Sequence, residues 1–224
     1  MIKELTDYYS ILNILENNSF QAYFVGGCVR DYLLGRKITD VDIATDAKPS
    51  QLTELFFSFP TLTYGLKYGT LAIKGELPCQ ITTFRSENDY RDSRHPSVVR
   101  FVKTAKSDAK RRDFTINALY LAGNGAIEDY YCGLQDLKNK VIRMIGKPEI
   151  RLQEDPLRIL RALRLADSLR FSLEGQLEEQ LLLNITRLQG LNKQKIKEET
   201  KKYQTKGKYY EKYSRYLTDI VQID

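Results

Sequence analysis

The chain has 224 residues, 42% of them hydrophobic, and 35 Lys and Arg against 29 Asp and Glu give it a formal net charge of +6. No continuous apolar run is long enough to span a bilayer, and residues 1–18 have the pattern of an amphipathic helix rather than a secretory signal, so we predict no membrane span. Three widely spaced cysteines and one histidine, His95, suggest neither a disulfide framework nor a zinc cluster, and they fit a reducing cytoplasm.

The first candidate site lies in the stretch AYFVGGCVRDYLLGRKITDVDIAT, residues 22–45. A strand-like run, AYFV, stops at Gly26 and Gly27, and a short helix opens directly after them. Glycines let the backbone approach a ligand closely, and the first N–H groups of a helix attract anions. Arg30, one turn into the helix, can add bidentate contacts to phosphate. A tight turn with no ligand is the alternative explanation.

Two aspartates with one residue between them follow this helix. Alternate side chains of a strand share a face, so Asp40 and Asp42 in TDVDIAT project together while Val41 and Ile43 point into the core. Adjacent carboxylates repel each other unless a cation lies between them, and such oxygens suit Mg²⁺, which completes its shell with water and substrate phosphates. We therefore predict that Asp40 and Asp42 hold a metal ion; a pair of solvated acids at a strand end is the alternative.

The rest of the first half alternates strand-like runs with helical ones. The runs rich in β-branched and aromatic residues are GTLAIKG at 69–75, CQITTF at 79–84 and VVRFV at 98–102. A helical pattern covers PSQLTELFFSF at 49–59. This alternation is typical of a mixed sheet with helices packed on it.

The pattern changes near residue 145 and is helical almost throughout from there on. Apolar residues recur at helical spacing in three segments, at 155–171, 173–188 and 192–204. We therefore predict an α+β fold, with a mixed-sheet catalytic head over residues 1–145 and an all-helical neck over 146–224.

The positive charge gathers near the C-terminus. From Arg187 to Arg215 the sequence has ten Lys or Arg against three Glu, a net +7. Tyrosines at 203, 209, 210, 213 and 216 interleave with these cations, a combination that suits an RNA backbone with bases available for stacking. The cations that we predict to bind RNA are Lys201, Lys202, Lys206 and Lys208. A solvated helical face explains the same residues.

The segment VGGCVRDYLLGRKITDVDIAT resembles the signature of the class II tRNA nucleotidyltransferase (CCA-adding enzyme) and bacterial poly(A) polymerase family, a branch of the polymerase-β-like nucleotidyltransferases. Four later stretches continue the resemblance up to residue 171: ITTFRSENDYRDSRHPSVVRFV, KRRDFTINALY, DYYCGLQDLKNKVIRMIG and EDPLRILRALRLADSLRF. Five motifs in the family's order are far more specific than any one of them. The resemblance implies a polymerase-β-like head followed by a helical neck.

The resemblance also implies a reaction. The 3′ hydroxyl of an RNA would attack the α-phosphate of a nucleoside triphosphate, pyrophosphate would leave, and Mg²⁺ held by Asp40 and Asp42 would stabilise both oxygens. Gly27 and Arg30 would cradle the triphosphate, and Arg112 would assist them.

In KRRDFTINALY the resemblance implies a ribose site. Asp113 and Asn117 are four residues apart, so on a helix they share a face and can reach the sugar while Phe114 and Leu119 pack inward. An aspartate capping the N-terminus of a short helix is the alternative.

In EDPLR the resemblance implies an amino-acid template made by Asp155 and Arg158. Cytosine and adenine each offer an amino group beside a ring-nitrogen acceptor, which a carboxylate and a guanidinium complement. Uracil and guanine would leave the carboxylate unpaired, a penalty of about 1–3 kcal/mol. Arg161 and Arg164 continue the helix and can reach phosphate. An Asp N-cap before Pro156 is the alternative.

The expected function is addition of CCA, from CTP and ATP, to the 3′ end of tRNA. An enzyme that adds only A, a poly(A) polymerase, or an RNA-binding relative without catalysis are the alternatives. Two departures from the family motivate the last of these. Gln80 stands where many relatives have an acid, and the chain ends at Asp224 without the usual body and tail domains, as a minimal enzyme or a truncated chain would. The oligomeric state stays open.

Overall fold

The computed structural model describes residues 4–90, 96–203 and 207–221, which form two compact units. The first unit comprises the chain up to Glu87 together with Val98–Arg112 and Ile116–Leu134. The second includes Asp113–Thr115 and the chain from Gln135 onward. The chain therefore crosses between the units more than once, and the division predicted at residue 145 stays a prediction.

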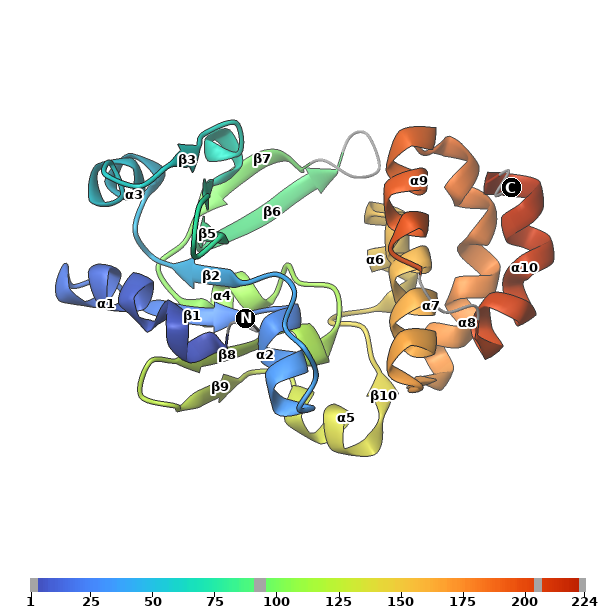
Figure 1. The fold of residues 1–224 in the computed structure, drawn as a ribbon. Helices are drawn as coiled ribbons and strands as arrows, with labels where there is room; N and C mark the ends of the chain where they lie inside the picture. Colours follow the sequence, from blue (N-terminus) through green and yellow to red (C-terminus); the bar gives the residue numbers. More distant parts are fainter. Residues whose placement is uncertain (1–3, 91–95, 204–206, 222–224) are drawn as a thin grey trace. The chain divides into compact units, whose positions relative to one another are not determined.

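A seven-stranded mixed sheet forms the centre of the first unit, as predicted (Figure 1). Its strands lie in the order β3-β4-β5-β2-β1-β8-β9. Their bounds are Ala22–Val25 for β1, Asp42–Thr45 for β2, Thr61–Leu62 for β3, Thr70–Ile73 for β4, Cys79–Thr83 for β5, Leu119–Ala122 for β8 and Ile127–Asp129 for β9. Neighbours are antiparallel except β2 and β5, which are parallel. The central strands are rich in β-branched and aromatic residues, and Phe24, Ile43 and Ile81 are fully buried there.

Short helices accompany this sheet. The α-helices of the first unit are α1 (Tyr9–Asn17), α2 (Gly27–Leu33), α3 (Pro49–Leu55) and α4 (Ala105–Ala109), with 3-10 turns η1 (Leu5–Tyr8) and η2 (Leu66–Tyr68). In α1 the side chains of Ile11, Leu12 and Leu15 lie on one face, and all three are buried. The predicted helix at 49–59 is confirmed as α3, where Pro49 occupies the first turn.

The strands β6 (Arg85–Tyr90) and β7 (Pro96–Phe101) form a separate two-stranded sheet. The backbone N–H of Val102 donates to the carbonyl of Phe84 at 2.9 Å and joins the chain at the root of this hairpin. The single histidine, His95, lies outside the described residues.

The second unit is mainly helical, as predicted. Its helices are α6 (Pro148–Glu154), α7 (Leu157–Leu169), α8 (Gly175–Asn184), η4 (Ile185–Gly190), α9 (Lys193–Lys201) and α10 (Lys208–Val221), and α5 (Gly133–Asn139) crosses the border of the two units. Most side chains of α7 are buried, because α9 and α10 both contact it. A short parallel pair, β10 (Val141–Ile142) with β11 (Ser172–Leu173), was not predicted; Arg170 ends α7 in the left-handed conformation and turns the chain into β11.

All three cysteines are free thiols. Within the described ranges, no helix combines the length and the apolar character that crossing a membrane requires.

Candidate active site

The turn between β1 and α2 brings the backbone close to an acidic side chain. Gly26 precedes α2 with φ +83° and ψ −143°, a conformation that strongly favours glycine. A Cβ atom at this position would lie 3.3 Å from Asp42 Oδ2 and 3.9 Å from Arg112 Nη1. Gly26 therefore permits both the turn and the approach of a carboxylate and a guanidinium to it.

Asp42 is the first residue of β2, and Asp40 lies just before the strand. Val41 and Ile43 are buried, so the predicted alternation of core and site side chains is confirmed. Asp40 is exposed and accepts a hydrogen bond from the Thr39 hydroxyl at 3.2 Å, whereas Asp42 is half-buried. The two acids thus differ in exposure to solvent, although both lie at the N-terminal end of β2.

Gln80 lies beside Asp42 on the parallel strand β5. The register pairs the two residues directly, so their side chains project from the same face of the sheet. Among the described residues no group of three or more His, Cys, Asp or Glu side chains could hold a metal. Asp40 and Asp42 nevertheless offer the one or two carboxylates that Mg²⁺ takes from a protein when water and phosphate complete its shell. That the two carboxylates hold a divalent cation stays a prediction.

Arg30 lies over the same turn. A Cβ on Gly27 would lie 3.4 Å from Arg30 Nη2. The guanidinium donates to both carboxylate oxygens of Asp31, at 3.0 and 2.8 Å, and to Asn117 Oδ1 at 2.8 Å. The sequence predicted Arg30 and Asn117 as separate nucleotide contacts; the structure joins them in the first unit.

The predicted helix that carries both Asp113 and Asn117 is wrong. Only a 3-10 turn, η3 (Thr115–Asn117), is present, and Asp113 belongs to the second unit whereas Asn117 belongs to the first. The reason is backbone pairing: Phe114 forms an antiparallel bridge with Met144, and the N–H of Ile145 donates to the Asp113 carbonyl at 2.9 Å. An extended segment paired in this way cannot make helical hydrogen bonds. Phe114 is fully buried, as predicted.

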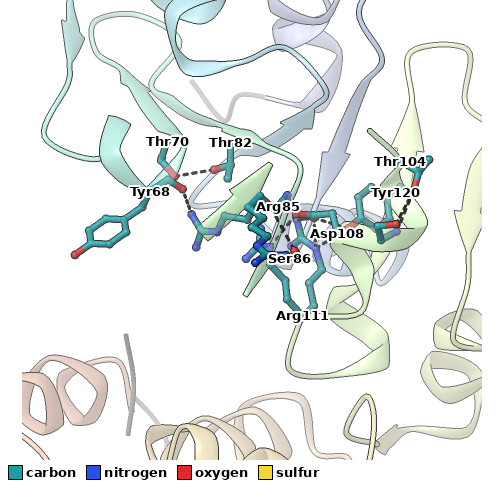
Figure 2. A network of polar contacts seen from close by, with 12 residues as sticks. Tyr68, Thr70, Thr82, Arg85, Ser86, Thr104, Asp108, Arg111 and Tyr120 are labelled. Atoms are coloured by element: carbon teal, nitrogen blue, oxygen red, sulfur yellow. Dashed lines mark hydrogen bonds and ion pairs between the residues drawn. The ribbon is translucent and has the colours of Figure 1, made fainter. Parts of the chain in front are cut away.

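A residue that the sequence reasoning missed, Asp108, holds Arg112 in place. Its fully buried carboxylate accepts from Arg112 Nη2 at 3.1 Å, from Arg111 Nε at 2.8 Å and from the Tyr120 hydroxyl at 2.6 Å. Figure 2 shows Asp108 between Arg85, Arg111 and Tyr120. Burial raises the pKa of Asp108, but the two arginines outweigh it and bring the pKa well below its usual value. An Asp four residues before Arg112 is the signal that could have identified it.

The junction of α6 and α7 holds the predicted template pair. Asp155 lies between the helices, and its Oδ1 accepts from the Leu157 N–H at 3.1 Å, as in the capping alternative. Arg158 is buried, and its Nη1 donates to the Arg151 carbonyl at 2.8 Å and to Glu154 Oε2 at 3.2 Å. This bond is local to the start of α7, whose N-cap is Pro156, and the template role stays a prediction.

The other two arginines of α7 have carboxylate partners within the second unit. Arg161 Nε donates to Asp113 Oδ2 at 2.7 Å. Burial raises the pKa of Asp113, but Arg161 outweighs it and lowers the pKa far below its usual value. Arg164 Nε donates to the buried Glu199 at 2.7 Å. Both arginines are fixed by these ion pairs, and their predicted contact with phosphate stays a prediction.

Two of the five tyrosines of the basic segment are buried and cannot stack on bases; for the other three, stacking stays a prediction. Tyr209 and Tyr213 are buried because they lie four residues apart and form the core-facing stripe of α10. The hydroxyl of Tyr203 binds Asp167, and Tyr216 is exposed. The predicted RNA-binding lysines Lys201, Lys202 and Lys208 are exposed, and Lys206 lies outside the described residues.

The Gly26–Gly27 turn, Asp42 at the start of β2 and Arg112 beside both belong to one mixed-sheet unit, as in the head of a nucleotidyltransferase. A family model described as the poly A polymerase head domain matches residues 22–143. The chain belongs to this family.

The relatives that share this head include two curated CCA-adding enzymes. The one from Bacillus subtilis (strain 168) is 48% identical over 170 residues, which cover 75% of this chain and 42% of the relative. The one from Lactobacillus helveticus (strain DPC 4571) is 45% identical over 190 residues, 84% of this chain and 47% of the relative. The chain thus spans about half the length of these relatives.

Solved structures of similar proteins agree with the family assignment. The Bacillus stearothermophilus CCA-adding enzyme in complex with CTP is 33% identical with a TM-score of 0.80, over 96% of this chain and 52% of that one. A tRNA nucleotidyltransferase complexed with a primer tRNA and an incoming ATP analog is 31% identical with a TM-score of 0.73, over 93% of this chain and 61% of that one. The predicted fold class is therefore confirmed.

Proposed function

We propose that the chain transfers nucleotides from CTP and ATP to the 3′ end of tRNA and builds the sequence CCA. The similar proteins named above support this substrate choice, since one was solved with CTP and another with a primer tRNA and an ATP analog. A cytoplasmic location remains part of the proposal. The observation that supports the proposed nucleotide transfer is that Asp42 and Arg112 both lie beside the Gly26 turn, at one end of the central strands.

Each side chain of this site has a proposed role. Asp40 and Asp42 would hold a divalent cation, Mg²⁺ in our proposal, which when bound stabilises charge on the attacking and leaving oxygens. Arg112 and Arg30, with the Gly27 backbone, would bind the triphosphate. The RNA 3′ hydroxyl would lose its proton to water, its oxygen would form a bond to the α-phosphorus, and the bond from that phosphorus to the leaving pyrophosphate would break.

Sugar and base recognition are proposed for the second group of residues. Asn117, in the first unit, would contact the ribose; for Asp113, in the second unit, this role follows from the resemblance alone. Asp155 and Arg158 would accept from and donate to the Watson–Crick edge of cytosine or adenine, and Arg161 and Arg164 would support phosphate binding. The RNA itself would contact Lys201, Lys202, Lys206 and Lys208.

A gel assay tests the function. The purified chain is incubated with tRNA lacking CCA, with tRNA ending in C, with tRNA ending in CC and with an oligo(A) primer, each with CTP, ATP or both. We expect CTP alone to extend the first two substrates to CC and ATP alone to extend only the CC-ended tRNA. CTP and ATP together should complete all three tRNAs, and the oligo(A) primer should stay unextended.

Each alternative gives a different gel. Extension of only the CC-ended tRNA would identify an A-adding enzyme, and long ladders on oligo(A) would identify a poly(A) polymerase. Binding of tRNA without any extension would contradict the proposal and favour an RNA-binding relative without catalysis.

A further inference from the structure

The carboxylate of Asp108 accepts several hydrogen bonds within the first unit. Its Oδ1 accepts from the backbone N–H of Arg85 at 3.0 Å and from Arg111 Nε at 2.8 Å. Its Oδ2 accepts from the Tyr120 hydroxyl at 2.6 Å and from Arg112 Nε and Nη2 at 3.3 and 3.1 Å. The carboxylate is 0% exposed, so water does not compete for these five donors. Figure 2 shows Arg85, Arg111 and Tyr120 around Asp108.

These contacts determine which part of Arg112 faces the candidate phosphate site. Nε and Nη2 are bound to Asp108, and Nε also donates to the Tyr120 hydroxyl at 2.9 Å. The guanidinium carbon lies 5.2 Å from the centre of the Tyr120 ring, so the side chain is also fixed against this ring. Nη1 is then the nitrogen that lies on the side of Gly26 and Asp42. Because the guanidinium is planar, binding of Nε and Nη2 fixes the direction in which Nη1 points.

The same carboxylate also binds the root of the β6–β7 hairpin. Besides its N–H bond to Asp108, Arg85 donates from Nη1 to the Tyr68 carbonyl. At the end of β7, the Phe101 ring lies so close to Gly69 that a Cβ there would be 2.7 Å from Cε1. Asp108 is therefore shared between the hairpin root and the arginine beside Asp42.

We propose that Asp108 is a positioning residue for nucleotide transfer, which aims Arg112 at the triphosphate and links this arginine to the root of the β6–β7 hairpin. The inference rests on the proposed function. A purely structural role predicts a loss of stability on substitution and no specific dependence on Arg112. A positioning role predicts that Asp108 matters to the reaction only while Arg112 is present.

A double-mutant cycle separates the two. Steady-state kcat and KM for CTP are measured with tRNA lacking CCA for wild type, Asp108→Asn, Arg112→Ala and the double variant. We expect Asp108→Asn to lower kcat/KM by about 10- to 100-fold, because displacing a substrate-positioning group by about 1 Å costs up to roughly 100-fold. In the Arg112→Ala background the same substitution is expected to change kcat/KM less than about 3-fold. An equal loss in both backgrounds overturns the proposal.

Tyr120→Phe covers the case in which Asp108→Asn does not fold. It removes one hydroxyl that binds both Asp108 and Arg112, and its effect on kcat/KM should also vanish in the Arg112→Ala background; an effect that persists there overturns the proposal.

The matched control is Asp167→Asn. Asp167 is a buried carboxylate that accepts from the N–H groups of Tyr209 and Tyr210, so its loss should lower stability and leave kcat/KM unchanged.

The two proposals fail differently. A wild-type chain that neither binds CTP in calorimetry nor extends tRNA refutes the proposed function and this inference with it. A wild-type chain that extends tRNA but shows no coupling between positions 108 and 112 refutes only the inference.

Discussion

Substitution of Gly26 by Ala tests the geometry of the candidate site most directly. The backbone there has φ +83° and ψ −143°, and forcing an alanine into such a conformation costs of order 1–3 kcal/mol. At about 2–4 °C per kcal/mol for a chain of this size, the melting temperature should fall by roughly 2–12 °C. The new Cβ would also lie 3.3 Å from Asp42 Oδ2, so this carboxylate must move by a few tenths of an ångström.

The displacement of Asp42 predicts a loss of activity beyond the loss of stability. We expect kcat/KM for CTP to fall about 10-fold or more at a temperature where the variant is fully folded, because the position of the reacting groups decides the rate. The control is Gly125→Ala, since Gly125 has φ +85° and open space where the Cβ would lie. The control should lose stability and keep its activity. If Gly26→Ala keeps the wild-type kcat/KM, or if both variants lose the same fraction of it, the reasoning is refuted.

Four further outcomes are expected. Asp42→Ala should abolish incorporation at saturating Mg²⁺ while tRNA binding in a filter assay survives, and near-normal turnover would contradict the metal assignment. Asp155→Ala should let UTP or GTP compete with CTP, and unchanged selectivity with lower stability would favour the capping alternative. Lys201→Ala with Lys208→Ala should reduce the salt slope of tRNA binding by roughly 0.7–0.9 per lost phosphate contact, without changing the KM for CTP; an unchanged slope would point to a solvated face. The stability gap between wild type and Asp108→Asn in chemical denaturation should be full at neutral pH and shrink as the pH falls below about 4, because the folded-state pKa of Asp108 is depressed; a constant gap would contradict this.

The local pattern was sufficient to predict the central strands of the sheet and the longer helices of the second unit. The alternation through Val41, Asp42 and Ile43 predicted β2 and the burial of Val41 and Ile43 correctly, because a strand has a strict two-residue period wherever one face is buried. The apolar spacing of the second half predicted α7 and its neighbours for the corresponding reason, a wide stripe at helical period. Gly26 and the helix after it were likewise predicted from residue type alone.

Side-chain partners could not be predicted in this way. The segment around Phe114 has helical spacing, yet its backbone pairs with residues 143–145, which no local pattern reveals. Arg30 and Asn117 are 87 positions apart in the sequence, and only the order of β1 and β8 in the sheet brings them together. The tyrosines of α10 were interpreted as a stacking surface because composition does not show which face α7 covers. Tertiary packing decides all three.

The pairing of Arg158 bears on base selection. If this guanidinium is to read a base edge, it must do so while Nη1 is bound to Glu154 and to the Arg151 carbonyl. A guanidinium has five N–H donors in one plane, so these partners fix the orientation of that plane. Glu154 would then contribute to selectivity without touching the base, because it fixes the plane from which Arg158 donates. Selectivity of this kind depends on orientation as well as charge, and a lysine at position 158, which keeps the charge and loses the planar fork, should not support it.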